Sequence, residues 1–385
     1  MQKILVLGAG LSASSLIKYL LDHSDNHNWK VRIGDLSTET AEKKINGHPN
    51  GEAFKFDVNN KQQCYREVEH ADIVISMLPT SMHLTVAEAC IENSKNMVTA
   101  SYVSKEIQLL HEKALKKGIL ILNEIGVDPG IDHMSAMRVI DRIREEGGNI
   151  EEFYSFTGGL VAPKYDNNPW NYKFTWNPKN VVIAGQGSCM YIKNGRYKYI
   201  PYSKLFQRIL RTNVLDYGEF EVYPNRDSLK YREIYGLHDI PSMYRGTMRR
   251  PGFSKAWNVL VQLGCTDDTY IVEDSMNMTY REFINSFLKY EPNVPVERKL
   301  AEYVGIEEDS EIMYKLRWLG IFSDELIGLK EASPAEILLH ILLQKWILDE
   351  DDKDMIVMQH RFVTQKAKKE QEILSSMVIE GSDQI

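Results

Sequence analysis

A short glycine-containing segment near the N-terminus has the spacing of a dinucleotide-binding turn. The sequence KILVLGAGLSA, residues 3–13, places Gly8 and Gly10 directly after an apolar run and before an amphipathic stretch. Gly8 would permit the tight turn, Gly10 would let the backbone approach a pyrophosphate, and Ala13 would let the helix pack close to the strand. A tight strand-to-helix turn that binds no ligand is the alternative interpretation.

An acidic residue follows the second apolar run, where dinucleotide-binding folds hold the ribose. Asp35 comes directly after residues 31–34. A carboxylate there accepts hydrogen bonds from the ribose hydroxyls and repels a 2′-phosphate, so the sequence favours NAD and leaves NADP possible. An aspartate that only caps a turn or helix is the alternative. Asp57 is predicted to contact the adenine. The other residues predicted for the cofactor site are Leu11, Ser12, Leu36, Val58, Leu78, Pro79 and Ser101.

The elements that must position this site lie in residues 1–127. Short apolar runs alternate there with amphipathic stretches, which predicts an α/β domain with a doubly wound parallel sheet of the Rossmann type. The expected strands are residues 4–7, 31–33, 73–76, 97–99 and 119–122.

The rest of the chain predicts an α+β catalytic domain, residues 128–278 and 349–385, with a small all-helical insertion domain at 279–348. A helix is expected over 129–146, because Gly147 and Gly148 form a stop signal. Thr279 with Glu282 and Ser333 with Glu336 are spaced as helix-capping boxes. Further strands are expected over 152–157, 181–184, 190–192 and 220–223, and a hairpin over 355–363 and 372–379.

Composition limits the class of protein. The chain has 385 residues, 43% hydrophobic and 26% charged, as expected for a globular protein of two or three domains. Its net charge of -8 disfavours nucleic acid or an anionic membrane as partner. Cysteines without CxxC spacing and the lack of a long apolar run at the N-terminus predict a cytoplasmic protein. No metal site is expected, because His23 and His27 lack a third ligand.

Motifs along the whole chain resemble those of the saccharopine dehydrogenase (L-glutamate-forming) family. They are, in part, ISMLPTSMH, VTASYVS, NEIGVDPGIDHMSA, TGGLVAPKYDNNPWNYKFTW, YPNRDS, YRGTMRRPGF and DMIVMQH. The resemblance implies an NAD(P)-dependent oxidoreductase acting on the CH–NH bond of saccharopine. Hydride transfer through an imine would interconvert saccharopine with L-glutamate and 2-aminoadipate 6-semialdehyde. It also implies a Rossmann domain, a catalytic domain and a small helical domain.

The resemblance assigns acid–base work to residues within these motifs. Asp128 matches the aspartate of the DPG motif, and Tyr102 matches a tyrosine beside the nicotinamide. The chemistry needs such groups, because the amine must lose a proton and water must attack the imine. Asp128 could also cap the next helix, and Tyr102 could be a packed aromatic residue. Thr157 departs from the family's usual cysteine, and its hydroxyl cannot titrate near neutral pH as a thiol can.

Arginines in two motifs are candidates for holding a substrate with several carboxylates. Arg226 and Arg245 match the motif positions, and arginine binds carboxylates in a bidentate manner. Surface ion pairs are the alternative for both. Thr247, Lys173 and Phe174 complete the predicted substrate set. The expected partner is therefore a small molecule, and a homodimer is the commonest assembly for such a protein.

Two departures from the family keep other functions open. One is Thr157, and the other is the chain end at residues 381–385, where family members continue into a further segment rich in small residues. We expect the cofactor domain to be less firmly closed as a result. The alternative enzyme is a related amine or imine oxidoreductase of the lysine 6-dehydrogenase or carboxynorspermidine reductase type. The alternative from another class is a non-catalytic dinucleotide-binding protein.

Overall fold

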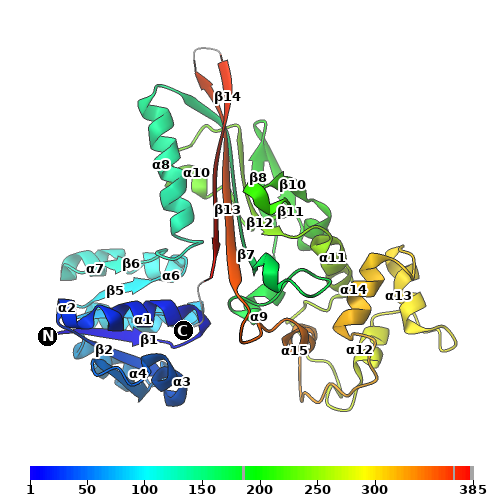
Figure 1. Ribbon diagram of the computed structural model, residues 1–385, viewed down its shortest axis with the longest axis horizontal. Coiled ribbons are helices and arrows are strands. Elements are labelled where there is room, and N and C mark those ends of the chain that lie inside the picture. The colour runs from blue at the N-terminus through cyan, green and yellow to red at the C-terminus, as the bar shows by residue number, and fades with distance from the viewer. Residues whose placement is uncertain (184–186, 367–368, 382–385) are drawn as a thin grey trace. The chain divides into compact units, whose positions relative to one another are not determined.

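The chain folds into two units, and each builds its own β-sheet (Figure 1). The computed structural model describes residues 1–183, 187–366 and 369–381. The first unit comprises Met1–Ser135, and the second begins at Ala136. The helical segment expected at 279–348 shares one hydrophobic core with the sheet of the second unit. Residues 382–385, part of the chain end considered above, lie outside the described residues.

The first unit is a parallel six-stranded sheet with the strand order β3-β2-β1-β4-β5-β6. This is the doubly wound order of dinucleotide-binding domains, so the predicted fold class is confirmed. The strands are β1 (Gln2–Leu7), β2 (Trp29–Asp35), β3 (Gly51–Lys55), β4 (Ile73–Ser76), β5 (Asn96–Thr99) and β6 (Ile121–Leu122). The helices are α1 (Ser14–Asp22), α2 (Ser24–His27), α3 (Thr38–Ile45), α4 (Lys61–Glu69), α5 (His83–Glu92), α6 (Lys105–Gln108) and α7 (His111–Lys117).

The apolar run in β1 explains why this sheet is buried on both faces. Ile4 and Val6 pack into one hydrophobic core, and Leu5 and Leu7 pack into another on the opposite face. Successive side chains of a strand point to opposite faces, so a strand covered on both sides needs a continuous apolar run. The carboxyl ends of these strands then lie at one edge, where doubly wound sheets bind ligands.

The second unit is a mixed sheet centred on β7 (Asn149–Val161). This strand pairs in parallel with β12 (Ser242–Arg249) and antiparallel with β13 (Asp354–Lys366). The predicted α+β character is therefore confirmed. The main path runs β10-β11-β12-β7-β13-β14, and β8 pairs with β12 and β9. The remaining strands are β8 (Cys189–Lys193), β9 (Arg196–Ile200), β10 (Leu210–Asn213), β11 (Glu219–Pro224) and β14 (Lys369–Glu380).

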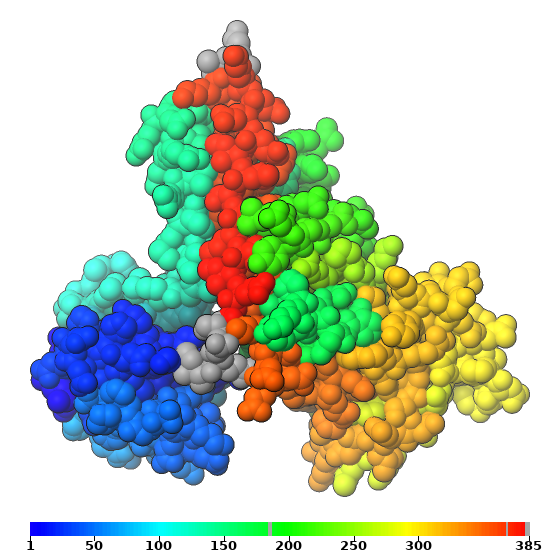
Figure 2. Space-filling view, viewed as in Figure 1, coloured from blue at the N-terminus to red at the C-terminus, as the bar shows by residue number. Residues whose placement is uncertain are grey.

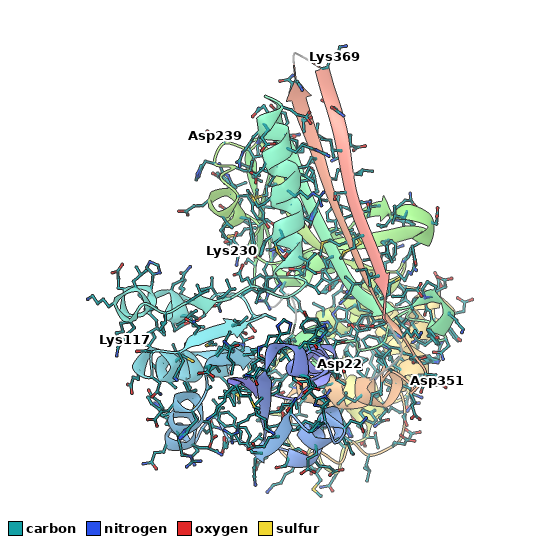
Figure 3. The ribbon with its side chains drawn as sticks, turned by 60° about the vertical axis from the view of Figure 1, so that its left-hand side comes forward. Asp22, Lys117, Lys230, Asp239, Asp351 and Lys369 are labelled. Carbon is teal, nitrogen blue, oxygen red and sulfur yellow. The ribbon has the colours of Figure 1, made fainter. Side chains whose placement is uncertain are left out.

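The strands β13 and β14 form a long antiparallel hairpin, as the sequence predicted. Figure 3 labels Lys369, where β14 begins. Figure 2 shows the C-terminal strand, in red, on the surface of the second unit. Leu374 and Ile379 are both exposed on β14. The hairpin brings the C-terminal part of the chain beside β7, so segments far apart in sequence complete one sheet.

The helices of the second unit confirm both capping predictions. Thr279 and Glu282 form a capping box at α12, and Ser333 and Glu336 form another at α15. The helix α8 (Ile131–Glu145), expected at 129–146, leads from the first unit into the second. The other helices are α9 (Pro178–Val182), α10 (Tyr231–Ile234), α11 (Phe253–Leu263), α12 (Tyr280–Ser286), α13 (Val296–Val304), α14 (Glu311–Leu319) and α15 (Pro334–Lys345).

The strand expected at 181–184 is wrong for the part that the structure describes, because α9 covers it through Val182. Asn177 caps this helix by accepting from the Asn180 N–H, and Pro178 takes the first helical position. Proline there loses no helical hydrogen bond, so an Asn-Pro start favours a helix over a strand. Residue 184 lies outside the described residues.

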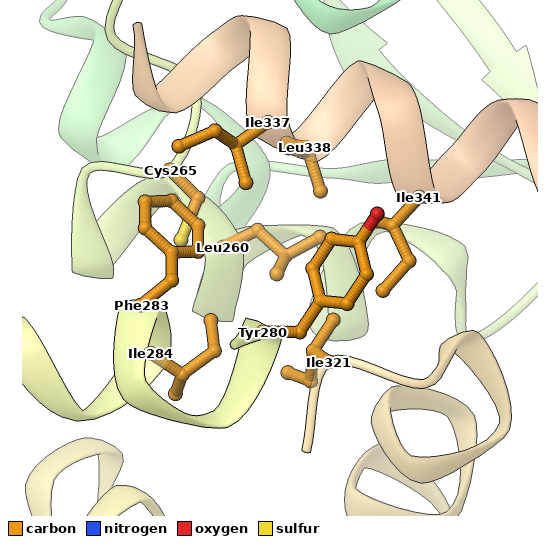
Figure 4. Close-up of a pocket in the computed structure, with 9 residues that line it drawn as sticks. All are labelled: Leu260, Cys265, Tyr280, Phe283, Ile284, Ile321, Ile337, Leu338 and Ile341. Carbon is orange, nitrogen blue, oxygen red and sulfur yellow. The ribbon is translucent and has the colours of Figure 1, made fainter. Parts of the chain in front are cut away.

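A small apolar cavity lies within the helical part of the second unit (Figure 4). Its volume is ≈ 10 Å³, and Leu260, Cys265, Tyr280 and Phe283 are among the side chains that line it. Since this is room for about one water molecule, it is a packing defect rather than a ligand site. None of the helices in the described ranges is long and apolar enough to cross a membrane.

Candidate functional site

The glycine turn after β1 fits a dinucleotide. Gly8 has φ +99°, and a Cβ there would lie 2.7 Å from the Met77 carbonyl oxygen, so a side chain is excluded. A Cβ on Gly10 would meet nothing within 4 Å, so the backbone is open to a ligand. Ala13 is 1% exposed and packs in the core beneath the first helical turn. These are the three properties that the glycine pattern predicted.

Asp35 at the end of β2 is joined to the glycine turn. Its Oδ2 accepts a 2.7 Å hydrogen bond from the Ala9 N–H, and its Oδ1 accepts a 2.9 Å bond from the Ser37 N–H. The carboxylate therefore lies where the first two strands end, as expected for a ribose ligand. It also organises the turn, which is the alternative interpretation, and both roles can hold together.

A lysine lies near this carboxylate. Lys44 donates to the Ser14 hydroxyl, which belongs to the helix that follows the glycine turn. Burial lowers the pKa of Lys44, and the negative charge of Asp35 partly opposes that effect. The cofactor end of the sheet thus carries a cation as well as an anion, which the sequence analysis did not consider.

The other predicted cofactor residues are distributed along the same sheet edge. Leu11 and Leu36 are exposed at 69% and 65%, so apolar side chains stand uncovered beside the glycine turn. Such surface suits the flat face of an adenine ring. Ser12 is also exposed, and Leu78 and Pro79 follow the end of β4. Asp57 lies after β3, where its Oδ1 accepts from the Asn59 N–H at 2.9 Å, and Val58 is buried.

The two residues predicted for acid–base work in this unit are in contact. The Tyr102 hydroxyl, after β5, donates a 2.7 Å hydrogen bond to Oδ1 of Asp128. Asp128 does not take the N-cap position, because α8 begins only at Ile131. The Gly130 N–H, just before α8, donates to the side chain of Asp132, in the first turn of this helix, at 2.7 Å. A phenol and a carboxylate joined in this way can pass a proton between them.

Three residues of this region were missed by the sequence analysis. Glu124 lies after β6 and accepts from the Val103 N–H at 3.0 Å, and its other oxygen lies 3.0 Å from Nε2 of His133. His83, at the start of α5, contacts Ser76 and Ser101. All three missed residues stand within the motifs that carry the family resemblance, and that position was the available signal.

In the second unit, the pairing register groups predicted substrate residues on one face of the sheet. Thr157 of β7 lies opposite Thr247 of β12, and Ser155 lies opposite Arg245. Alternate residues of a strand share a face, so Thr157, Thr247 and Arg245 face the same side. Thr157 and Arg245 are buried, with Arg245 5% exposed, and Thr247 is partly buried. This face therefore carries hydroxyl groups and a guanidinium side by side.

The two arginine motifs meet along β12. The Asn225 N–H, next to Arg226, donates to the Arg245 carbonyl at 2.9 Å. The Arg245 guanidinium lies 4.0 Å from the centre of the Tyr231 ring, a cation–π contact. Arg226 has φ +48°, and its carbonyl accepts from the Met190 N–H. The bend that carries Arg226, just after β11, thus lies against the strand that carries Arg245.

Lys173 and Phe174 make strong contacts within the second unit. The Lys173 ammonium pairs with Asp352 and, at 3.0 Å, with Asp349. Burial opposes the charge on Lys173, and these two aspartates outweigh that effect and raise its pKa. Phe174 is 3% exposed and packs 5.5 Å from the Trp346 ring. Both side chains therefore support the segment that carries them.

One further buried cation was missed. Arg249, two residues after Thr247, is 3% exposed, and its guanidinium lies 4.7 Å from the Tyr172 ring and 5.3 Å from the Phe253 ring. Burial raises the pKa of the Tyr172 hydroxyl to about 12, so this tyrosine stays neutral. The adjacent arginines of the motif YRGTMRRPGF were the signal that was available.

Comparisons with known proteins cover almost the whole chain. A family model described as the saccharopine dehydrogenase NADP binding domain matches residues 4–122. Another, described as the saccharopine dehydrogenase C-terminal domain, matches residues 126–384.

Curated relatives match over similar lengths. "Saccharopine dehydrogenase [NADP(+), L-glutamate-forming]" of Schizosaccharomyces pombe is 33% identical over 370 residues, which cover 94% of this chain and 81% of that protein. The mitochondrial alpha-aminoadipic semialdehyde synthase of Mus musculus is also 33% identical, over 94% of this chain and 39% of that longer protein. The solved apo saccharopine dehydrogenase (L-Glu forming) of Saccharomyces cerevisiae aligns over 100% of this chain and 86% of its own, with TM-score 0.86 and 28% identity.

Proposed function

The chain belongs to the saccharopine dehydrogenase family, and we propose that it oxidises saccharopine to L-glutamate and 2-aminoadipate 6-semialdehyde, or runs the reverse reaction, with a nicotinamide dinucleotide. The observation that supports this most is the hydrogen bond between Tyr102 and Asp128. It supports an acid–base pair at the carboxyl edge of a sheet whose glycine turn fits a dinucleotide.

The roles of the two residues follow from the reaction. The bound dinucleotide would accept the hydride from the carbon beside the secondary amine. The Asp128 carboxylate takes the amine proton, and the Tyr102 hydroxyl orients this carboxylate through its hydrogen bond. Asp128 releases this first proton to solvent, and it then takes the proton that water gives up as water adds to the imine carbon. The C–N bond breaks as Asp128 returns that proton to the nitrogen and the new hydroxyl group loses its own proton, which yields the amino group of glutamate and the aldehyde.

Substrate binding is assigned to the second unit. Arg245 and Arg226 would hold carboxylates, because a guanidinium binds them in a bidentate manner. Thr247 and Thr157 would donate hydrogen bonds from the same sheet face, and Thr157 would do so without the titration that a thiol provides. For Lys173 and Phe174, the contacts with Asp352 and Trp346 support a role in shaping the site.

Which dinucleotide is used is a separate question. The fungal relatives carry NADP(+) in their names, and the matching family model is named for NADP, so NADP is favoured. Lys44 supplies a nearby cation that suits a 2′-phosphate. The Asp35 carboxylate repels such a group and is the observation that supports NAD. We therefore propose NADP, with NAD as the alternative.

The deciding experiment follows the absorbance of reduced nicotinamide with saccharopine and either NADP+ or NAD+. Reduction with saccharopine, and not with lysine or carboxynorspermidine, supports the proposed substrate. Reduction with lysine or carboxynorspermidine instead would support the related amine or imine oxidoreductase. Tight dinucleotide binding without turnover of any of them would support a non-catalytic role. The expected cytoplasmic location and homodimer stay predictions.

A further inference from the structure

A buried histidine links the ends of β4 and β5, beside the segment that leads to Tyr102. His83 is 1% exposed and begins α5. Its Nδ1 lies 2.8 Å from the Ser76 hydroxyl, at the end of β4, and its Nε2 lies 2.7 Å from the Ser101 hydroxyl, just after β5. The ring therefore bridges neighbouring strands at the edge where the cofactor is proposed to bind.

The environment keeps this imidazole neutral. Burial lowers the pKa of His83 to about 4, and its hydrogen-bond partners in the described structure are serine and threonine hydroxyls. A neutral imidazole has one donor nitrogen and one acceptor nitrogen, and a hydroxyl can take either part. Both ring nitrogens can therefore bond at once without a buried charge, which gives a rigid bridge.

Ser101 connects this bridge to Tyr102. Ser101 precedes Tyr102 in the chain, and its carbonyl accepts a 3.0 Å bond from the Glu124 N–H. Its own N–H donates to the Thr99 hydroxyl at 3.3 Å. The next residue, Tyr102, donates to Asp128. The backbone that carries the tyrosine is thus fixed on one side by His83 and on the other by the segment that leads to Asp128.

We infer that His83 is a positioning residue, which holds Ser101 and so orients the Tyr102 hydroxyl toward Asp128. The inference rests on the proposed function for its kinetic consequences, since it assigns Tyr102 to the reaction. The structural consequence of the inference, that His83 keeps the backbone of residues 101–103 rigid, does not depend on the proposed function.

The kinetic test is a double-mutant cycle between His83→Ala and Tyr102→Phe. If His83 acts through Tyr102, His83→Ala lowers kcat by about 10-fold in the wild-type background and by less than about 2-fold in Tyr102→Phe, because coupled residues are not additive. An equal loss in both backgrounds would overturn the inference. Ser101→Ala replaces His83→Ala if the latter fails to fold, since it removes a single hydroxyl.

Ser76→Ala is the matched control, because it removes the other hydroxyl bound to the same ring. It is expected to lower the melting temperature as Ser101→Ala does, with a smaller loss of kcat. Equal losses of kcat would point to a general packing role and contradict the inference.

A second readout does not need turnover. Hydrogen exchange of the backbone amides at residues 101–103 is expected to accelerate at least about 10-fold in His83→Ala and to stay near the wild-type rate in Tyr102→Phe. Unchanged exchange would overturn the positioning role. If wild-type protein does not turn over saccharopine but exchange responds as expected, the proposed function fails and the positioning role stands.

Discussion

The Tyr102 hydroxyl and the Asp128 carboxylate share a 2.7 Å hydrogen bond, although one residue follows β5 and the other precedes α8. Both residues belong to the first unit. The bond therefore joins the two residues that we propose for acid–base work. The consequences for function can be tested residue by residue.

Replacing Asp128 with asparagine should lower kcat by at least about 100-fold, because general acid–base catalysis contributes that much and an amide cannot accept the proton. The dinucleotide Kd, measured by protein fluorescence, should stay within about 3-fold of wild type, since the glycine turn is untouched. Asp22→Asn is the control, because Asp22 is an exposed partner of Lys18 on α1 (Figure 3) and should leave kcat unchanged. An Asp128→Asn enzyme with nearly full kcat would contradict the assigned role.

Replacing Arg245 with glutamine should raise the KM for saccharopine by about 10-fold or more, because a charge-assisted bond to a carboxylate is lost. The KM for the dinucleotide should change little. Arg211→Gln tests the same substitution on the same sheet, where Arg211 forms an exposed ion pair with Glu219. If both variants affect KM equally, or neither does, Arg245 does not hold the substrate.

Lys173→Met should reduce stability rather than substrate affinity. The side chains of Lys173 and Asp352 are 4% and 5% exposed, and removing one partner of a buried pair costs about 3–5 kcal/mol. Chemical denaturation of the second unit measures this loss. Lys289→Met, which removes an exposed ion pair with Glu291, is expected to have no measurable effect. A folded, stable Lys173→Met protein with a raised KM for saccharopine would instead favour direct contact with the substrate.

The stability of the first unit should depend on pH through His83. Its pKa is lowered from 6.5 to about 4 by burial, so the native state binds this proton less readily than the unfolded state. The stabilisation is present above the unfolded pKa and is lost as the pH falls from about 6.5 toward 4. Between about pH 7 and pH 5 the loss is about 2 kcal/mol.

Urea denaturation of wild type and His83→Ala at both pH values isolates this effect. The variant starts less stable at pH 7, and the difference from wild type is expected to narrow by about 2 kcal/mol at pH 5. A difference that does not change with pH would mean that His83 titrates alike in the native and unfolded states.

Much of this fold could be predicted because local signals agreed with the tertiary structure. The glycine turn, the capping boxes at Thr279 and Ser333, and the C-terminal hairpin all depend on short segments with their own chemistry. The strands β3, β9, β10 and β12 were missed, because each mixes polar and apolar residues. In β12, Arg245 and Arg249 are buried, which is unusual for charged side chains and weakens the strand pattern.

The candidate site could be predicted less completely, because its contacts join distant segments. The motifs identified Tyr102 and Asp128, but the sequence could not indicate that they bond to each other. Lys173 was assigned to the substrate, but the sequence could not indicate that it pairs with Asp349 and Asp352, which lie about 180 residues further along the chain. His83 was overlooked because its place in the motif ISMLPTSMH was its only signal, and its partners Ser76 and Ser101 could not be known from the sequence.

The most direct test of the account is the initial rate of dinucleotide reduction by purified protein supplied with saccharopine. We expect reduced nicotinamide, L-glutamate and 2-aminoadipate 6-semialdehyde in equal amounts, with NADP+ preferred over NAD+. A preference for NAD+ would still support the proposed reaction, and it would indicate that Asp35 selects NAD over NADP. No glutamate with either dinucleotide, from protein that binds the dinucleotide, would contradict the central claim.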